Sequence, residues 1–460
     1  MKMSYILLFF LALNMACNSP EKANNQVTTK DSIPQKSVAT SLIATSGAET
    51  QERAISPITE QKPLSSKKIP HKTKGVNPGA DYLVSEVLPL LAGKRVGIAT
   101  NHTALLSDGT HLVDELQKTG VNVVKVFSPE HGFRGTADAG EKVSSSVDAK
   151  TGLPLVSLYG NNKKPTPAQL QDLDIVVFDI QDVGTRHYTY ISTLSYIMEA
   201  CAENGKAVFV LDRPNPNGWY TDGPMMHSAY TSFIGMHQIP IVHGLTIGEY
   251  AKMVNEEGWL KGGKKCNLTV IKCTGYTHSM RWNETGLKWI PPSPNMVSDY
   301  AAYLYPILCW YEATNVSVGR GTEEAFTILG APWNQELMAG KTEAYNLSWE
   351  KHDFTPRSIQ GKAKNPPYQD VLCHGIKFTN QTDGKNLFLA GITLLEAFYQ
   401  SHKLSGDTKP FFSAGLEKWA GNTSFPTQII NNVSPEEIYQ SWQGETEAFR
   451  EKRKKYLLYP

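Results

Sequence analysis

The sequence predicts an α/β protein whose first domain is built on a mostly parallel sheet and whose second, smaller domain is α+β. From residue 83 to residue 211, short runs rich in Val, Ile and Phe alternate with amphipathic stretches. That pattern is typical of strands buried on both faces and covered by helices. After about residue 305 the alternation stops. We therefore predict a Rossmann-like domain at residues 76–305 and a C-terminal α+β domain at 306–460.

The elements of the first domain follow from the spacing of their apolar residues. Runs such as RVGIAT (95–100) and DIVVFDI (174–180) are short and continuously apolar, which favours buried strands. Longer stretches repeat their apolar residues at helical spacing. The predicted strands are residues 95–100, 121–127, 154–159, 174–180 and 206–211, and the predicted helices are 110–119, 167–173 and 189–204.

The second domain has a less regular pattern. Segments 372–378, 387–398 and 435–456 indicate isolated strands and amphipathic helices. We expect this domain to pack on the first and to leave a ligand site in the cleft between them, where pockets are common.

The first 17 residues have the form of an export signal. Lys2 precedes an apolar run, Tyr5–Leu13, that has signal-peptide length and is too short to span a bilayer. Residues 1–17 resemble a bacterial lipoprotein signal that ends at a lipidated Cys17, although Asn14 stands where such signals usually have Leu. The alternative is an ordinary signal peptide that happens to contain a cysteine.

Residues 18–75 are predicted to be a disordered linker. No Phe, Tyr or Trp occurs between Cys17 and Tyr82, so the segment cannot bury enough apolar surface to offset its ordering entropy. It holds nine Lys or Arg against five Asp or Glu, which leaves the folded body slightly acidic. We expect a lipid-anchored protein of the cell envelope, on the periplasmic side or on the outer-membrane surface.

Composition and missing motifs exclude several classes of function. Lys+Arg 45 against Asp+Glu 44 gives no basic surplus for nucleic acid, and membrane contact is expected only through the lipid anchor. No G-x-G-x-x-G follows the first strand, and neither H-E-x-x-H nor C-x-x-C occurs. We therefore predict no cofactor and no metal. Cys266 and Cys273 either pair or are free buried thiols, and the oligomeric state is left open.

Polar residues follow four of the predicted strands. In open α/β sheets, ligands bind beyond the carboxyl ends of the strands, so these residues indicate a polar ligand site. For any one segment the alternative is helix capping or a local ion pair, such as Arg213 with Asp212. The four segments are NHT (101–103), SPEHG (128–132), DIQDVGTR (179–186) and DRPNP (212–216).

Several long motifs, in the same order along the chain, resemble those of one family, the NamZ-type exo-β-N-acetylmuramidases, long catalogued only as a domain of unknown function. The resemblance extends from about Gly93 to Tyr459. Its motifs are FSPEHGFRGTADAG (127–140), FDIQDVGTRHYTYI (178–191), LDRPNPNG (211–218), PPSPNM (291–296), GRGT (319–322) and LGAPW (329–333).

The resemblance implies removal of terminal N-acetylmuramic acid from the non-reducing end of peptidoglycan fragments. It implies a Rossmann-like domain joined to a C-terminal domain, and it assigns the catalytic role to Glu130. One departure concerns the motif S-E-G-R-G-T, in which Val318 occupies the acidic position. Either Glu312 or Glu323 supplies the missing carboxylate, or that carboxylate is structural in the family.

Glycoside cleavage needs an acid for the leaving oxygen and a second group for the anomeric carbon. Glu130 is the candidate acid. Asp182 is the preferred second carboxylate, with Asp179 as an alternative, and attack by the sugar's own acetamide is a third possibility. The sequence does not decide between retention and inversion.

Muramic acid carries a lactyl carboxylate, which the two-pronged guanidinium of arginine binds well. Arg186 and Arg320 are the candidates for this contact, and Arg213 is a third. Further candidates for contacts with the sugar are Tyr188, Tyr190, Asn101, His102, His131 and Asn295.

Each of these further candidates also has a structural interpretation. A tyrosine is more often a core residue than a sugar platform. His131 either tunes Glu130 or stabilises its loop, and Asn295 in Pro-Ser-Pro-Asn can equally well shape its turn.

Two alternatives to the muramidase remain. The first is a lipid-anchored glycan-binding protein without turnover, which would need a sugar platform but no acid. The second is a hexosaminidase that acts on N-acetylglucosamine, which would not need an arginine for the lactyl group.

Overall fold

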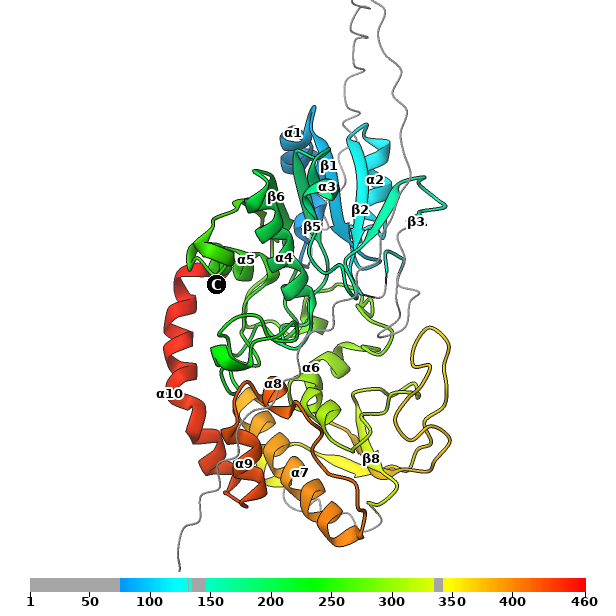
Figure 1. Ribbon diagram of the computed structural model, residues 1–460, viewed down its shortest axis with the longest axis vertical. Helices are drawn as coiled ribbons and strands as arrows, with labels where there is room; N and C mark the ends of the chain where they lie inside the picture. Colours follow the sequence, from blue (N-terminus) through cyan, green and yellow to red (C-terminus); the bar gives the residue numbers. More distant parts are fainter. Residues whose placement is uncertain (1–74, 131, 135–145, 335–341) are drawn as a thin grey trace, which may run out of the picture. The chain divides into compact units, whose positions relative to one another are not determined.

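A seven-stranded sheet forms the centre of the N-terminal part of the protein (Figure 1). The computed structural model describes residues 75–130, 132–134, 146–334 and 342–460. The strands of this sheet are β1 (Arg95–Thr100), β2 (Asn122–Ser128), β3 (Ser146–Val147), β4 (Pro154–Ser157), β5 (Ile175–Asp179), β6 (Ala207–Leu211) and β7 (Asn267–Ile271). Their order is β3-β4-β2-β1-β5-β6-β7, and every neighbouring pair is parallel except β3 with β4.

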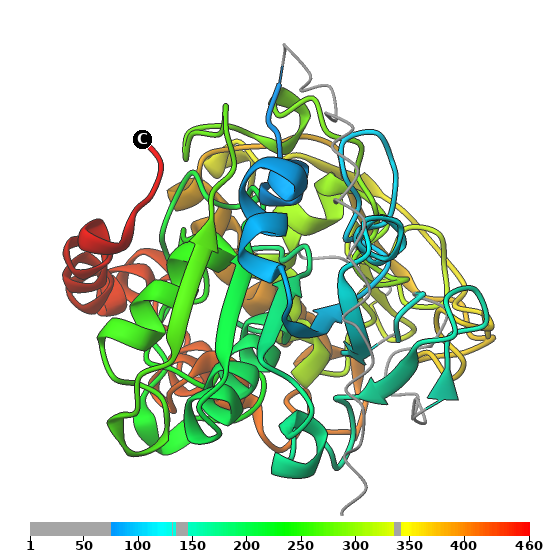
Figure 2. The same ribbon diagram turned by 90° about the horizontal axis from the view of Figure 1, so that it is seen from above.

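Helices cover both faces of this sheet, as Figure 2 shows from above. The helices of the N-terminal part are α1 (Leu88–Leu91), α2 (Leu112–Lys118), α3 (Pro167–Leu170), α4 (Tyr190–Glu203), α5 (Ile247–Glu256) and α6 (Asp299–Leu308).

The central strand β5 shows why both faces must be covered. Val176 and Phe178 belong to a hydrophobic cluster that includes residues of α4 and α5. Ile175 and Val177 belong to a second cluster, with residues of α1 and α2. Because successive side chains of a strand point to opposite faces, a strand that is buried along its whole length needs a layer on each side.

The predicted α/β class is confirmed, and all five predicted strands are present within a few residues of their expected limits. In this domain the prediction missed β3 and β7 among the strands and α1, α5 and α6 among the helices. The edge strand β7 is only partly buried, so its sequence, NLTVI, is less apolar than that of a central strand. Helix α5 begins with a capping box between Thr246 and Glu249.

The C-terminal domain combines helices with a three-stranded antiparallel sheet of order β8-β10-β9. Its main cluster of buried side chains is continuous with that of the first domain. Helix α6 runs across residue 305, and the division at 305/306 stays a prediction. The elements are β8 (Ile328–Ala331), β9 (Trp349–Lys351), β10 (His374–Phe378), α7 (Gly384–Ser405), α8 (Leu416–Ala420), α9 (Ser424–Ile430) and α10 (Pro435–Arg453).

The five cysteines of the described residues are buried free thiols, so Cys266 and Cys273 do not pair. Within the described ranges, no helix has the length and apolar character needed to cross a bilayer. Residues 1–17, with Cys17, and nearly all of the linker at 18–75 lie outside the described residues.

Candidate active site

The strand order places a crevice at the carboxyl end of the sheet. From β1 the chain continues to β2 and β4 on one side, whereas β5, β6 and β7 lie on the other. Loops that leave β1 and β5 therefore diverge, and ligands of open α/β sheets bind at such a point. Glu130 follows β2 at this edge, two residues beyond its last residue.

A cavity of about 520 Å³ lies at this edge and is shared by the two domains. Of the predicted site residues, four line it: Glu130, Tyr188, Tyr190 and Arg320. The full lining is Glu130, Tyr159, Gly160, Asn161, Lys163, His187, Tyr188, Thr189, Tyr190, Phe233, Ile234, Ser293, Met296, Tyr305, Glu312, Arg320, Phe326 and Trp419.

Glu130 accepts a hydrogen bond from the hydroxyl of Tyr159, just beyond β4. Burial, together with the negative charge of Glu130, raises the pKa of Tyr159 to about 12. Tyr159 therefore keeps its proton near neutral pH and acts as a hydrogen-bond donor that orients the carboxylate.

A second carboxylate, Glu312, enters the same cavity from the C-terminal domain. The Nε of Arg320 donates to Glu312 Oε1 at 2.6 Å, and the Arg320 guanidinium also lies 5.1 Å from the centroid of the Phe326 ring. Burial is the largest single influence and lowers the pKa of Arg320, but the charge and hydrogen bond of Glu312, with smaller contributions from Tyr305 and Glu130, together raise that pKa overall. The charges of both carboxylates and of Arg320 thus meet in one cavity.

The two predicted tyrosines form a buried wall of this cavity. Tyr188 packs edge-to-face on Tyr190 and on Tyr305, with ring centroids 5.1 Å and 5.8 Å apart. The hydroxyl of Tyr190 accepts from Asn101 Nδ2 at 3.0 Å and donates to Pro292 O at 2.6 Å. Asn101 therefore does not line the cavity itself but positions Tyr190, which does.

Asp182, the preferred second carboxylate, does not line the cavity. It is buried, and its Oδ2 accepts from the backbone N–H of Gly184 at 2.7 Å. Burial raises the pKa of Asp182 to about 7, against the opposing hydrogen bonds from Gly184 and Val183. The alternative, Asp179, is held by Arg213 at 2.5 Å and 2.9 Å. The structure thus places Glu312, and neither aspartate, beside the cavity.

Arg186 and Arg213, both predicted to bind the lactyl group, are occupied by the protein itself. Arg186 is fully buried and donates to four backbone carbonyls, at Pro224, Ile239, Trp419 and Ala420. Arg213 is held by Asp179 and the carbonyl of Leu105. Neither arginine lines the cavity, so their expected role passes to Arg320.

His102 and Asn295 also lie away from the cavity. The Nε2 of His102 lies 2.7 Å from Pro291 O, and this histidine lines a separate, more open pocket. Asn295 is buried and donates to Lys362 O at 2.6 Å, which joins two segments that are distant in the sequence, and the turn-forming alternative stays a prediction. His131 lies outside the described residues.

Val318, at the position where the family pattern has an acid, packs in the main hydrophobic cluster and is 4% exposed. Of the two suggested replacements, Glu323 is on the surface, where Lys362 pairs with it at 2.6 Å. Glu312 is the one that reaches the cavity.

Several lining residues were missed by sequence reasoning. Lys163 Nζ lies 4.4 Å from the centroid of the Phe233 ring, and both face the cavity. Trp419, on α8, stacks on His187 with centroids 5.3 Å apart. Lys163 lies in the loop that follows β4, a strand end that the prediction overlooked, whereas Phe233 and Trp419 come from a distant loop and from a short helix of the second domain, where no strand-end rule points to them.

His187 cannot serve as an acid in this cavity. Its Nε2 donates to Trp419 O at 2.6 Å, and its Nδ1 lies 3.0 Å from Cys309 Sγ. Burial, with the nearby charge of Arg186, lowers the pKa of His187 to about 3, so the ring stays neutral. His187 and Arg186 together hold the carbonyls of α8 and fix Trp419 against the first domain.

Over the ranges that the structure describes, no three His, Cys, Asp or Glu side chains converge into a metal-binding group. Metal-independent catalysis stays a prediction.

The fold and the cavity define a two-domain α/β protein in which two carboxylates and an arginine line one cavity. The chain belongs to the NamZ family of exo-β-N-acetylmuramidases: the family model of the N-terminal part matches residues 96–300, and that of the C-terminal part matches residues 303–459.

Individual relatives agree with this assignment. The peptidoglycan β-N-acetylmuramidase NamZ of Bacillus subtilis (strain 168) is 38% identical over 396 residues, which cover 84% of this chain and 92% of that protein. Crystal structures of two DUF1343 family proteins from Bacteroides fragilis NCTC 9343 are also similar. They are 40% and 30% identical, with TM-scores of 0.71 and 0.74, and each match covers 84% of this chain and 99% of the other.

Proposed function

We propose that this protein is an exo-acting glycoside hydrolase that releases terminal N-acetylmuramic acid from the non-reducing end of peptidoglycan fragments. Family membership over both domains supports the reaction class. The observation that carries the proposal is that three charged side chains, those of Glu130, Glu312 and Arg320, line one cavity. A pair of carboxylates is the set of groups that glycoside hydrolysis requires.

The reaction begins in the form of the enzyme whose Glu130 carboxyl is protonated, and that proton passes to the glycosidic oxygen, so that the leaving sugar departs as an alcohol. Tyr159 holds Glu130 in place for this step. Glu312, whose negative charge faces the cavity, stabilises the positive charge that develops at the anomeric carbon. A water molecule then adds to that carbon and gives its proton back to Glu130.

Recognition of muramic acid is assigned to cationic groups of the cavity. Arg320 donates to Glu312 through Nε, and none of the described residues accepts a hydrogen bond from its terminal nitrogens. They can therefore bind the two oxygens of a lactyl carboxylate. Lys163 adds a second positive charge, and Phe233 and Trp419 offer apolar ring faces for the sugar.

The test is hydrolysis of a chromogenic N-acetylmuramic acid glycoside. Glu130→Gln keeps the shape of the side chain but supplies no transferable proton, so we expect turnover to fall about 10²–10⁴-fold. Wild-type protein that binds the glycoside without cleaving it would establish the binding-only alternative, and equal rates on the N-acetylglucosamine glycoside would remove the assignment to muramic acid.

For the location of the protein, we propose attachment to the cell envelope by a lipid on Cys17. The support is the apolar run and cysteine of residues 1–17, followed by the polar segment 18–75. Mass spectrometry of the mature N-terminus from cells should find a lipidated Cys17, and an unmodified terminus elsewhere would remove the anchor.

A further inference from the structure

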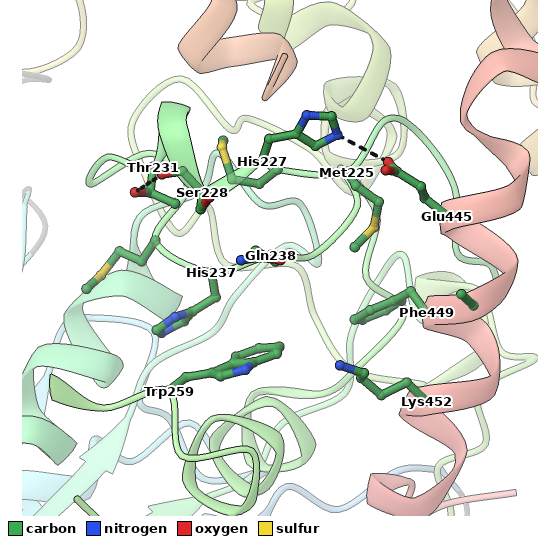
Figure 3. A pocket seen from close by; sticks show the side chains of 13 residues that line it. Met225, His227, Ser228, Thr231, His237, Gln238, Trp259, Glu445, Phe449 and Lys452 are labelled. Atoms are coloured by element: carbon green, nitrogen blue, oxygen red, sulfur yellow. Dashed lines mark hydrogen bonds and ion pairs between the residues drawn. The ribbon is translucent and has the colours of Figure 1, made fainter. Parts of the chain in front are cut away.

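A second cavity of about 520 Å³ lies outside the candidate active site (Figure 3). It is lined by the segment that follows β6, by Trp259 just after α5, and by one side of α10. Figure 3 shows His237 and Trp259 on one side and Glu445, Phe449 and Lys452 of α10 on the other. It shares no lining residue with the first cavity.

The inner surface of this cavity is aromatic and apolar. Trp259 is only half-buried, and its ring stacks on His237 with centroids 5.2 Å apart. Phe449 and three methionines, Met225, Met226 and Met236, complete the apolar lining. A partly exposed indole in a concave site is unfavourable in water and is stabilised when an apolar ligand surface covers it.

The rim carries polar groups with no net preference for either sign of charge. Glu445 pairs with His227 at 3.3 Å, and both are about half-exposed. Lys452 Nζ lies 5.9 Å from the centroid of the Trp259 ring and is itself paired with Glu257. With one carboxylate and one ammonium at its edge, together with hydroxyl and amide groups, the cavity suits a neutral ligand rich in hydrogen-bonding groups.

An apolar ring face surrounded by hydroxyl and amide groups is the chemistry of a neutral N-acetylhexosamine. Such a sugar places its C–H face on an indole and its polar edge on a rim of donors and acceptors. The candidate active site differs, because Arg320 and Lys163 suit a sugar that bears a carboxylate. The two cavities therefore match two different sugars.

We propose that this second cavity is a saccharide-binding site for a neutral N-acetylhexosamine unit of a glycan. The inference that this glycan is the one on which the enzyme acts rests on the proposed function. The segment between Met225 and Gln238 supports that link, because Phe233 and Ile234 face the first cavity while Thr231 and Met236 face the second. One segment thus forms part of both cavity walls.

The test measures binding of an N-acetylglucosamine tetramer by isothermal titration calorimetry, in a Glu130→Gln background that prevents cleavage. Trp259→Ala should raise the Kd about tenfold or more, because it removes the platform. Glu445→Gln should raise it about threefold to tenfold, because a charged acceptor becomes a neutral one. Circular dichroism checks that each variant is folded. If Trp259→Ala does not fold, the Kd of Glu445→Gln decides the test.

Glu447→Gln is the matched control, since Glu447 lies on the same helix, is about as exposed and does not line the cavity. It should leave the Kd unchanged. Unchanged Kd values in both Trp259→Ala and Glu445→Gln would overturn the proposal, as would binding lost in Arg320→Met but kept in Trp259→Ala. Hydrolysis of the small muramic acid glycoside, measured with Glu130 intact, should be unaffected by Trp259→Ala. Failure of the wild-type protein to cleave that glycoside while it still binds the tetramer would remove the proposed function and leave this site in place.

Discussion

The strand ends of the sheet and the loops of the C-terminal domain supply charged residues that are used in opposite ways. At the strand ends, Asp179 and Arg213 are buried and bind each other, and Asp182 is buried against backbone N–H groups. In the C-terminal domain, Glu312 and Arg320 form an ion pair that stays partly exposed and faces the cavity.

This difference separates charged residues that hold the scaffold together from charged residues that can take part in the reaction. A buried ionisable group is costly unless protein groups compensate it, and the groups packed around it then keep a substrate away from it. A charge beside a cavity keeps part of its hydrogen-bonding capacity for a ligand. Among the charged strand-end residues Glu130, Asp179, Asp182 and Arg213, Glu130 is the one that lines the cavity, two residues beyond β2.

Breaking the buried pair should have the largest effect on stability. Arg213→Met leaves Asp179 buried without a partner, so the free energy of unfolding should fall by about 3–5 kcal/mol. Urea denaturation followed by circular dichroism measures it. Arg357→Met, which breaks an exposed pair with Asp370, should change the midpoint much less. Equal effects of the two substitutions would contradict the assignment of Arg213 to the scaffold.

Glu312→Gln tests whether the carboxylate beside the cavity takes part in the reaction. Removal of the negative charge at the cavity should lower kcat on the muramic acid glycoside about 10²–10³-fold with little effect on unfolding. Glu323→Gln serves as the control, because Glu323 lies on the surface and should leave kcat unchanged. Full activity of Glu312→Gln would show that another group performs the second role.

Asp182 should make stability depend on pH. Its pKa is raised to about 7 by burial from an unfolded value of 3.8, so the folded state holds a proton that the unfolded state loses above about pH 4. The contribution of Asp182 to stability is therefore full below about pH 4 and is lost, by about 4 kcal/mol, as the pH rises through 7. Asp182→Asn should flatten this part of the pH profile of unfolding; an unchanged profile would show that Asp182 is ionised in the folded protein.

Of these substitutions, Arg320→Met should have the smallest effect, and that effect should be selective for the muramic acid substrate. Loss of the carboxylate-binding fork should lower kcat/KM for the muramic acid glycoside about 10–100-fold, mainly through KM. The ratio of rates on muramic acid and N-acetylglucosamine glycosides isolates this contact, because any disturbance of Glu312 affects both substrates. Arg186→Met should instead lower stability and leave that ratio unchanged, since Arg186 binds backbone carbonyls.

The first domain was largely predictable because its signal is local. Continuous apolar runs mark β1, β5 and β6, whereas the edge strand β7 and the two-residue β3 have little apolar sequence to mark them. In the site, Glu130 was predictable from a strand end and a motif, and Arg320 from a motif. Lys163 lies in the loop after β4, a strand end that the prediction overlooked, whereas Trp419 and Phe233 had no comparable signal, because their place depends on how distant loops pack.

By itself, the sequence determined the class of the first domain, the direction of its strands and the edge of the sheet at which Glu130 lies. These are local features, because the alternation of side chains along a strand and the position of the following loop depend on residues that are close in the sequence. Only the tertiary structure decided which charged residues remain available for a substrate. Arg186 and Arg320 are alike as isolated residues, yet the terminal nitrogens of Arg186 donate to four carbonyls contributed from three parts of the chain, whereas Arg320 faces a cavity beside Glu312. The availability of a buried charge depends on all of its neighbours in space, and most of these are far away in the sequence.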